Sequence, residues 1–529
     1  MVINVNNRTF TPRVRIESIH LINFKGVSDG ELEFNCKKNP FEKDIQSDIL
    51  GIYGQNGSGK TTALEALQLA VSLMSGEQLS AEKHAGLISQ SSDSARMEIV
   101  FQFTNPDEST YRVEYAFSIA YKNLPIDSSM RSVRNDIVHS GTKAATAALL
   151  ALVAPVPLAA IMIADKKSQQ KEYVLPKYAK YLVVEDEVVS LSGMFNGVDY
   201  RFAPVFDTRS EETAFLPKAK HADFFPKNTS SVIKDLERYK LRAKYSSKSF
   251  IFSDEVKQLI AEQFYQGGEE AMTPFNTLIL QLSSHASNNI RLLDSIIAGA
   301  SKDQKLPIYT ASSCVEIQLS DSTTTVDDEE LDVLKNGIRA LNVVLEQLIP
   351  GLSLEVIEQV DKSIINEAAN QIDYKKITVF SVRGNTRIPL SQESTGILHL
   401  ISSLGLISHA FANQNITVAI DEIDAGVYEY LLGELLLIFE EYGRGQLIFT
   451  CHNLRPMEVL NRKFVCFTTT NPNNRYLKLK NIRKEKNLRE AYLKEIIAGD
   501  QDEELYSSAK HGKIASALQK AGEIIGQET

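Results

Sequence analysis

Apolar and polar residues alternate along the first 125 positions in a pattern typical of a sheet. From 13 to 34 the alternation predicts two strands around a turn at 23–26 (NFKG). A third apolar run, 49–53, leads directly into a glycine-rich segment, and 63–74 carries apolar residues at helical spacing. Two later runs, 97–103 and 110–119, predict further strands. The pattern therefore predicts a strand–loop–helix unit inside a sheet.

A second block of short apolar strands comes much later in the chain, at 377–382, 416–420 and 446–450. Helical or loop patterns separate these strands, which favours an α/β fold of sheets covered by helices. Between the blocks, polar loops and helical segments prevail, and apolar spacing over 331–348 predicts a helix. We therefore expect four parts: an N-terminal lobe 1–125, a mainly helical insertion 126–375, a C-terminal lobe 376–482 and a helical tail 483–529.

Composition narrows the class of protein. The 529 residues are 43 % apolar and 23 % charged, as in a soluble globular protein, and the net charge is -10. An acidic chain is not uniformly coated for nucleic acid. Two stretches are locally basic: 217–250 has nine Lys or Arg against three Asp or Glu, and 462–494 has ten against two. They predict either faces for DNA, RNA or a partner, or ordinary solvated helix surface.

Compartment and membrane contact follow from other features. Four cysteines without a C-x-x-C pair suggest neither a disulfide framework nor a thiolate zinc site. The N-terminus lacks a secretion-signal pattern, so we expect a cytoplasmic protein. Residues 144–164 carry no charge and are long enough to cross a bilayer, but Pro155 and Pro157 interrupt them. Two short buried helices are the favoured interpretation, and membrane contact is the alternative.

The glycine-rich segment after the third strand matches G-x-x-x-x-G-K-[ST] in full and lies between a strand and a helix. Such a loop turns its backbone N–H groups toward phosphate oxygens, and the next helix presents its positive end to the same anion. Lys60 adds a cation at the β- and γ-phosphates, and the Thr61 hydroxyl suits a Mg²⁺ ion. The alternative is a chance glycine-rich turn. The predicted ATP-binding residues here are Gly54, Gln55, Asn56, Gly57, Ser58, Gly59, Lys60, Thr61 and Thr62.

The apolar strand 416–420 ends in two carboxylates, Asp421 and Glu422. Because successive side chains of a strand point in different directions, the two can take different roles. Asp421 is the predicted metal ligand together with Thr61, and Glu422 the predicted catalytic group that polarises the attacking water. Strands often end in acidic turns, so this pair gains its weight from the phosphate loop.

Two further features decide the subclass. Ser394 and Gly396 precede an amphipathic run at 397–404, and a small hydroxyl residue with a glycine at a helix start favours an anion. An ordinary helix cap is the alternative interpretation. His452 follows the strand 446–450, one strand beyond the two carboxylates. A lone histidine is more often structural, but this position makes it a second catalytic candidate.

Taken together, the NFKG turn, the phosphate loop, ESTG at 393–396, the two carboxylates and His452 resemble ABC-type ATPase heads of the SMC, RecF and overcoming-lysogenization groups. The resemblance covers 1–125 and 376–495. It implies ATP and Mg²⁺ as cofactors and a homodimer or higher oligomer in which two heads enclose ATP. Ser394 and Gly396 would then contact the γ-phosphate bound by the other subunit, His452 would sense it within its own subunit, and Asp424 would correspond to the aspartate after the catalytic glutamate.

The chain also departs from that family. ESTG is not the transporter sequence LSGGQ, and the separation of Lys60 from Asp421 implies a large insertion. The glutamine that such heads place between their lobes cannot be assigned, because Gln90 and Gln102 both qualify. Fewer than thirty residues follow the acidic 500–502, too few for a TOPRIM nuclease domain, so no nuclease site is expected.

The chain most resembles stand-alone ATPases of bacterial antiphage systems, of the Septu (PtuA-like) or retron-linked kind. That resemblance implies a nucleotide-dependent switch or sensor that controls a separately encoded effector such as a nuclease. The alternative is a DNA-repair or chromosome-organising ATPase of RecF or SMC type, and a less favoured third is the soluble ATPase of a transport complex.

Overall fold

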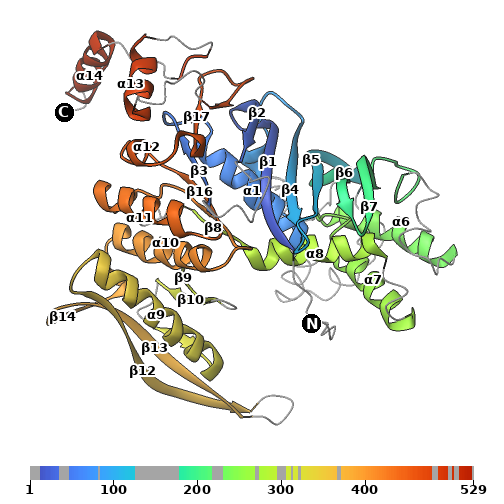
Figure 1. Cartoon of the computed structure of the whole chain (residues 1–529), viewed down its shortest axis with the longest axis horizontal. Coiled ribbons are helices and arrows are strands. Elements are labelled where there is room, and N and C mark those ends of the chain that lie inside the picture. The colour runs from blue at the N-terminus through green and yellow to red at the C-terminus, as the bar shows by residue number, and fades with distance from the viewer. Residues whose placement is uncertain are drawn as a thin grey trace, which may run out of the picture.

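Two six-stranded sheets organise the chain, and a long two-stranded ribbon projects from one side (Figure 1). This computed structural model describes residues 12–34, 47–80, 84–125, 178–216, 230–267, 273–294, 305–310, 314–319, 323–365, 371–478, 487–498, 503–505 and 511–526. Sheets with helices packed on them form a mixed α/β fold, so the expected fold class is confirmed. The uncharged run 144–164 lies outside the described residues.

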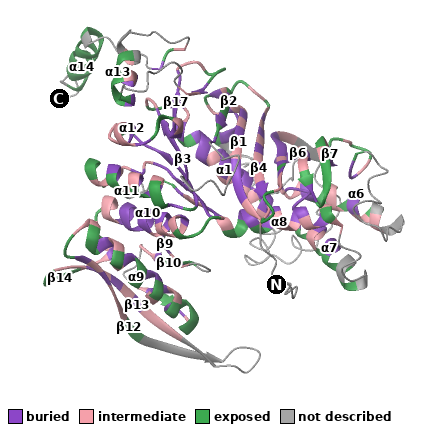
Figure 2. Ribbon diagram, viewed as in Figure 1, coloured by how far each residue is buried: buried purple, intermediate pink, exposed green. Residues whose placement is uncertain are grey.

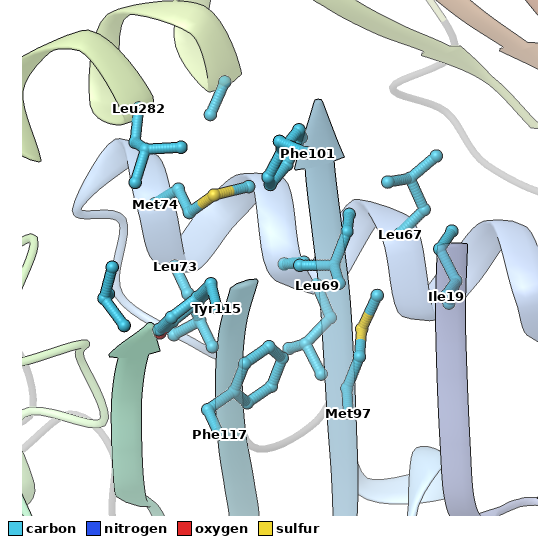
Figure 3. Packing of buried hydrophobic residues seen from close by; sticks show 14 of the residues in the cluster. Ile19, Leu67, Leu69, Leu73, Met74, Met97, Phe101, Tyr115, Phe117 and Leu282 are labelled. Carbon is cyan, nitrogen blue, oxygen red and sulfur yellow. The ribbon is translucent and has the colours of Figure 1, made fainter. Parts of the chain in front are cut away.

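The N-terminal sheet is antiparallel, with strand order β2-β1-β4-β5-β6-β7. In β4 buried and partly exposed residues alternate, which is the period-two pattern of a sheet with one covered face. Helix α1 (Lys60–Ser75) covers that face, and Figure 3 shows Leu67, Leu69 and Met74 directed at the strands. The strands are β1 (Arg13–Phe24), β2 (Val27–Glu33), β4 (Ser94–Thr104), β5 (Thr110–Pro125), β6 (Tyr178–Phe195) and β7 (Val198–Asp207).

The central sheet has the order β18-β17-β3-β16-β15-β8, and its five strands from β17 to β8 run parallel. Its inner strands are buried along their whole length, because elements pack on both faces. The expected strands at 49–53, 416–420 and 446–450 are confirmed here. The bounds are β3 (Asp48–Tyr53), β8 (Ile290–Leu293), β15 (Thr417–Ile420), β16 (Gln446–Thr450), β17 (Val465–Thr468) and β18 (Tyr476–Leu477).

Helices of the C-terminal half pack beside the central sheet (Figure 1). They are α10 (Thr395–Ala412), α11 (Glu429–Tyr442), α12 (Pro456–Val459) and α13 (Leu488–Ala498). Helix α14 (His511–Gly526), in contrast, is exposed over 512–525. Among the described residues, α10 is the one helix long and apolar enough to cross a membrane, and 56 % of it is buried inside the protein. Its burial against the sheet and α9 accounts for its apolar sequence.

The segment 126–375 differs from expectation. Strands and helices contribute about equally to its described part, so for those residues the prediction of a mainly helical insertion is wrong. Strand β6, which belongs to the expected insertion, pairs with β5 of the expected N-terminal lobe. The strands β6 and β7 of this segment therefore extend the N-terminal sheet. Its helices are α6 (Ser230–Tyr245), α7 (Asp254–Gly267), α8 (Pro274–Asn289) and α9 (Asp328–Leu348). Helix α9 confirms the helix expected at 331–348.

The projecting ribbon is formed by β12 (Leu352–Ile365) and β13 (Gln371–Arg383), paired antiparallel. Strand β13 also pairs with β11 (Thr324–Val326) and with β14 (Thr386–Pro389). A separate hairpin, β9 (Lys305–Tyr309) and β10 (Cys314–Gln318), packs with α9 beside α10. In Figure 2 the base of the ribbon is partly buried, which joins it to the body of the protein.

Candidate nucleotide site

The phosphate loop connects β3 to α1 and can be built only with glycine at several positions. Gly54, Gly57 and Gly59 have φ of 157°, 76° and 93°, a region that side chains disfavour. A Cβ at Gly54 would lie 1.7 Å from Oγ1 of Thr468 on β17. The loop is therefore fitted closely against a strand that comes more than 400 residues later in the chain.

Hydrogen bonds from Thr468 and Tyr476, in the C-terminal part of the sequence, hold the phosphate loop in place. The Thr468 hydroxyl donates to Ser58 Oγ at 2.5 Å, and Ser58 Oγ donates to the Gln55 carbonyl at 2.6 Å. The hydroxyl of Tyr476 donates to the Gly59 carbonyl at 2.7 Å. These contacts fix the loop before any ligand binds, so the site is preorganised.

Lys60 lies at the start of α1 with its ammonium group over the loop. Its Nζ donates to the carbonyl oxygens of Gly54 (2.9 Å) and Gln55 (3.1 Å). Burial lowers the pKa of Lys60, while the nearby carboxylates of Asp421, Glu422 and Asp424 act to raise it. A cation held by two neutral carbonyls at a helix N-terminus is well placed for a phosphate anion.

The two carboxylates meet the loop at the end of β15. The Thr61 hydroxyl donates to Asp421 at 3.3 Å (Oδ1) and 3.1 Å (Oδ2), which brings the two predicted metal ligands into direct contact. Thr450, at the end of β16, donates its hydroxyl to Asp421 Oδ1 and accepts the backbone N–H of Glu422 at 2.8 Å. Glu422 has φ 51°, a backbone conformation that is uncommon for a residue other than glycine.

His452 is exposed at the end of β16 and is held through its backbone. The Asp424 carboxylate accepts the N–H of His452 at 3.2 Å and that of Asn453 at 2.9 Å. Asp424 therefore ties the turn after Glu422 to the turn that carries His452. It positions other residues and does not itself line the cavity in this chain.

One cavity of about 370 Å³ brings most of the predicted residues together. Of the predicted set, Gly54, Gln55 and Ser58 shape the loop behind it, whereas Asp424, Ser394 and Gly396 lie elsewhere. The lining residues are Lys25, Gly26, Asn56, Gly57, Gly59, Lys60, Thr61, Thr62, Asp421, Glu422, Thr450 and His452.

The predicted γ-phosphate contacts lie on the far side of the turn that follows Glu422. Ser394 is exposed and caps α10, accepting the N–H of Ile397 at 3.4 Å. Gly396 lies directly against Gly426, since a Cβ on Gly396 would be 2.9 Å from the Gly426 Cα. Neither Ser394 nor Gly396 lines the cavity of its own chain.

Sequence reasoning missed several residues of the site. Lys25 and Gly26 line the cavity although neither is among the predicted site residues, and Lys25 forms an ion pair with Glu65 on α1. Thr450 could have been found, because a hydroxyl at the end of an apolar strand next to His452 is itself a polar signal. Tyr476, in contrast, lies in a segment with no local motif.

The two candidate glutamines now differ in position. The backbone of 87–89 hydrogen-bonds the turn that lines the cavity, with Lys25 N to Leu87 O at 2.8 Å and Ser89 N to Asn23 O at 2.9 Å. Gln90 follows directly, whereas Gln102 pairs with Arg15 at the opposite end of β1. This geometry favours Gln90.

The donor set suits ATP with Mg²⁺. Thr61 and Asp421 offer hydroxyl and carboxylate oxygens, the ligand types that Mg²⁺ prefers. The loop N–H groups and Lys60 fit phosphate oxygens. When bound, the ion would neutralise phosphate charge, and no other cation site is apparent in the described part of the chain, which holds no cluster of three His, Cys, Asp or Glu.

Comparison with known proteins agrees with this geometry at the level of the phosphate loop. Residues 18–153 match an AAA domain. The match includes the whole phosphate loop and agrees with the expectation of a P-loop ATPase domain. No curated protein matches the chain.

Several solved structures are similar to the chain, all at low identity. One is the Smc head domain of Pyrococcus furiosus with an extended coiled coil, bound to the C-terminal domain of ScpA: 14 % identity, TM-score 0.34, 92 % of this chain and 100 % of that one. A second is the SMC head domain of Thermotoga maritima, with 12 % identity and a TM-score of 0.30; the match covers 88 % of this chain and 100 % of that one. A third is the recombination mediator protein RecF with ATP, with 12 % identity and a TM-score of 0.28; the match covers 83 % of this chain and 94 % of that one. At such values the site rests on its own geometry.

The two basic stretches are partly committed to internal contacts. Lys240 donates to backbone carbonyls of Thr208 and Thr213, at 2.6 and 3.1 Å. Arg475 is buried and donates to the carbonyls of Thr469 and Gly26. Residues 217–229 and 479–486 lie outside the described residues, so nucleic-acid binding by 217–250 and 462–494 stays a prediction.

Proposed function

We propose that this protein binds and hydrolyses ATP as an ABC-type ATPase. The observation that carries the proposal is the contact of Thr61 with Asp421 in one cavity with Lys60 and Glu422. Residues from two distant parts of the sequence thus meet in the arrangement that phosphoryl transfer needs: a phosphate cradle, oxygen ligands for a cation and a carboxylate near the γ-phosphate position.

Each group has a role that follows from its chemistry. The loop N–H groups and Lys60 bind the phosphates and stabilise the charge that develops during transfer. Glu422 accepts a hydrogen bond from the attacking water and orients it, as a general base. His452 lies exposed at the same cavity, where its ring can donate to a phosphate oxygen. Thr450 holds Glu422 in place through the backbone.

We infer further that two copies complete each other's sites. Ser394 is exposed and lies apart from the cavity of its own chain, so its predicted phosphate contact has to be made in a second copy. An isologous twofold pair forms two such sites at once. This arrangement makes pairing depend on bound ATP and separation depend on hydrolysis.

Such a cycle suits a switch, and we propose that it controls a separately encoded effector of an antiphage system. The support is the resemblance of a head with an insertion between Lys60 and Asp421 to ATPases of that kind. The test is to express the chain together with its flanking genes and to challenge the cells with phage. If the wild type protects the cells and Lys60→Ala does not, the result supports the proposal. If Lys60→Ala protects the cells as well as the wild type does, the result contradicts it.

The ATPase proposal is tested by titrating purified protein with ATP and Mg²⁺ in a calorimeter. Lys60→Ala removes the cation at the phosphates, so binding should weaken by at least about 100-fold, the worth of a charge-assisted contact. Lys335→Ala is the matched control, because Lys335 forms an exposed ion pair with Glu358. Unchanged affinity in Lys60→Ala would overturn the site.

A further inference from the structure

The Glu393 side chain, immediately before Ser394, is largely buried and fully engaged. Its exposed fraction is 6 %. The Glu393 carboxylate accepts hydrogen bonds from the Ser381 hydroxyl, from Arg383 Nη1 at 2.6 Å and from the backbone N–H of Ser394 at 3.2 Å. Burial acts to raise the pKa of Glu393, but the bonds from Arg383 and Ser381 outweigh it and lower that pKa. The carboxylate is therefore ionised and needs these partners.

Both side-chain partners belong to the end of β13, one of the two strands of the projecting ribbon. Ser381 pairs with Leu354 of β12, and Arg383 pairs with Leu352. Figure 1 shows the ribbon running from this point out of the body of the protein. A single carboxylate thus links the base of the ribbon to Ser394, the residue that caps α10.

The buried charge of Glu393 holds the base of the ribbon and the start of α10 together. Separating the ribbon from Glu393 would leave an ionised carboxylate with few donors, which is unfavourable for a buried charge. The chain between β13 and Glu393 is also short, since β14 folds back on β13 and a 3-10 turn (Leu390–Gln392) leads to Glu393. A displacement of the base of the ribbon is therefore transmitted to Ser394.

We propose that Arg383 and Glu393 are positioning residues that couple the β12–β13 ribbon to the phosphate contact made by Ser394. This inference rests on the proposed function, because it assigns to the ribbon control over the site that Ser394 completes in a second copy. A partner that bends or holds the ribbon would then set the hydrolysis rate in the opposite subunit's cavity.

The test begins with Arg383→Ala, because the Arg383 side chain is 38 % exposed and its loss leaves the core intact. We expect hydrolysis to fall by about 10- to 100-fold, as for a catalytic contact displaced by about 1 Å. The affinity for ATP of the variant's own loop should not change. Glu393→Gln, nearly isosteric, should show the same split, and the double variant should be no worse than either single one.

Arg387→Ala is the matched control, because Arg387 forms an exposed ion pair with Glu355 across the same ribbon without touching Glu393. It should hydrolyse ATP at the wild-type rate. A mixture of Arg383→Ala with Lys60→Ala should recover hydrolysis, because one of the composite sites then pairs an intact loop with an intact Ser394. A merely structural role for Arg383 predicts no such recovery.

Wild-type turnover in Arg383→Ala and Glu393→Gln, or an equal loss in Arg387→Ala, overturns the coupling. Failure of the underlying function is recognised separately by Ser394→Arg. If Ser394→Arg abolishes hydrolysis while Arg383→Ala is normal, the composite site stands and the coupling falls. If Ser394→Arg is also normal, the composite site itself falls.

Discussion

Gly426 touches Gly396: a Cβ added to Gly426 would lie 2.3 Å from the Cα of Gly396 and 2.6 Å from its carbonyl oxygen. Gly426 also has φ 73°, in the left-handed region. The start of α10 and the turn after Glu422 are thereby packed backbone to backbone. A movement of Ser394 at the start of α10 would therefore also displace the turn that carries Asp424.

Gly426→Ala should therefore disturb hydrolysis while leaving ATP binding intact. The added methyl group cannot fit without separating α10 from the turn. Gly197→Ala is the control, since Gly197 has φ 77° with open space around it and shares the backbone strain without the clash. Phosphate release by Gly426→Ala should be at least about 10-fold slower than by Gly197→Ala. Equal rates would show that this contact has no role in the reaction.

Glu422→Gln should bind ATP and hydrolyse it about 10²- to 10⁴-fold more slowly, the usual worth of a general base. The amide keeps the size of the side chain but cannot accept a proton. Steady-state phosphate release measures the effect, with Glu429→Gln, at the exposed start of α11, as the control. Wild-type turnover would mean that another group activates the water.

The composite site predicts complementation between two inactive proteins. Ser394→Arg adds bulk and charge where a γ-phosphate should dock, so it should bind ATP without hydrolysing it. Mixing it with Lys60→Ala should restore part of the activity, provided that subunits exchange. Ala412→Arg, at the other end of the same helix, is the control for the added charge. No recovery despite proven exchange would require each site to be closed within one chain.

Thr450→Val removes a hydroxyl at nearly constant volume. Asp421 then loses a donor and the N–H of Glu422 loses its acceptor, at a cost of about 1–3 kcal/mol in the free energy of unfolding. Because Glu422 is also released, turnover should fall more than affinity for ATP. Thr417→Val, on the same sheet, removes a buried hydroxyl bonded to Gln446 at 3.1 Å and should lower stability alone. Equal turnover in the two variants would contradict a positioning role for Thr450.

The parts of the site that sequence predicted are those whose chemistry is written in consecutive residues. Gly54 to Thr61 form the loop because glycines and a lysine at fixed spacing leave few alternatives, and Asp421 follows from an apolar strand with a charged end. Thr468 and Tyr476 could not be predicted, since they act on the loop through tertiary packing alone. The insertion differs from expectation for a related reason. The strand expected at 377–382 lies within β13, but its extension before 377 and its pairing with β12 in a ribbon depend on contacts between strands that no local motif signals.

Strand β3 lies between β16 and β17 in the central sheet. On the ribosome, the residues that form the phosphate loop emerge about 400 positions before the strands that flank β3. The loop cannot reach its final shape until β16, β17 and Tyr476 have been synthesised, so nucleotide binding reports that these strands have folded against β3. Contacts of such long sequence separation also fold slowly and leave the early strands in need of protection. A cell therefore acquires a working nucleotide site only after these late strands have been synthesised, and a chain that stops before them lacks the contacts that shape the loop.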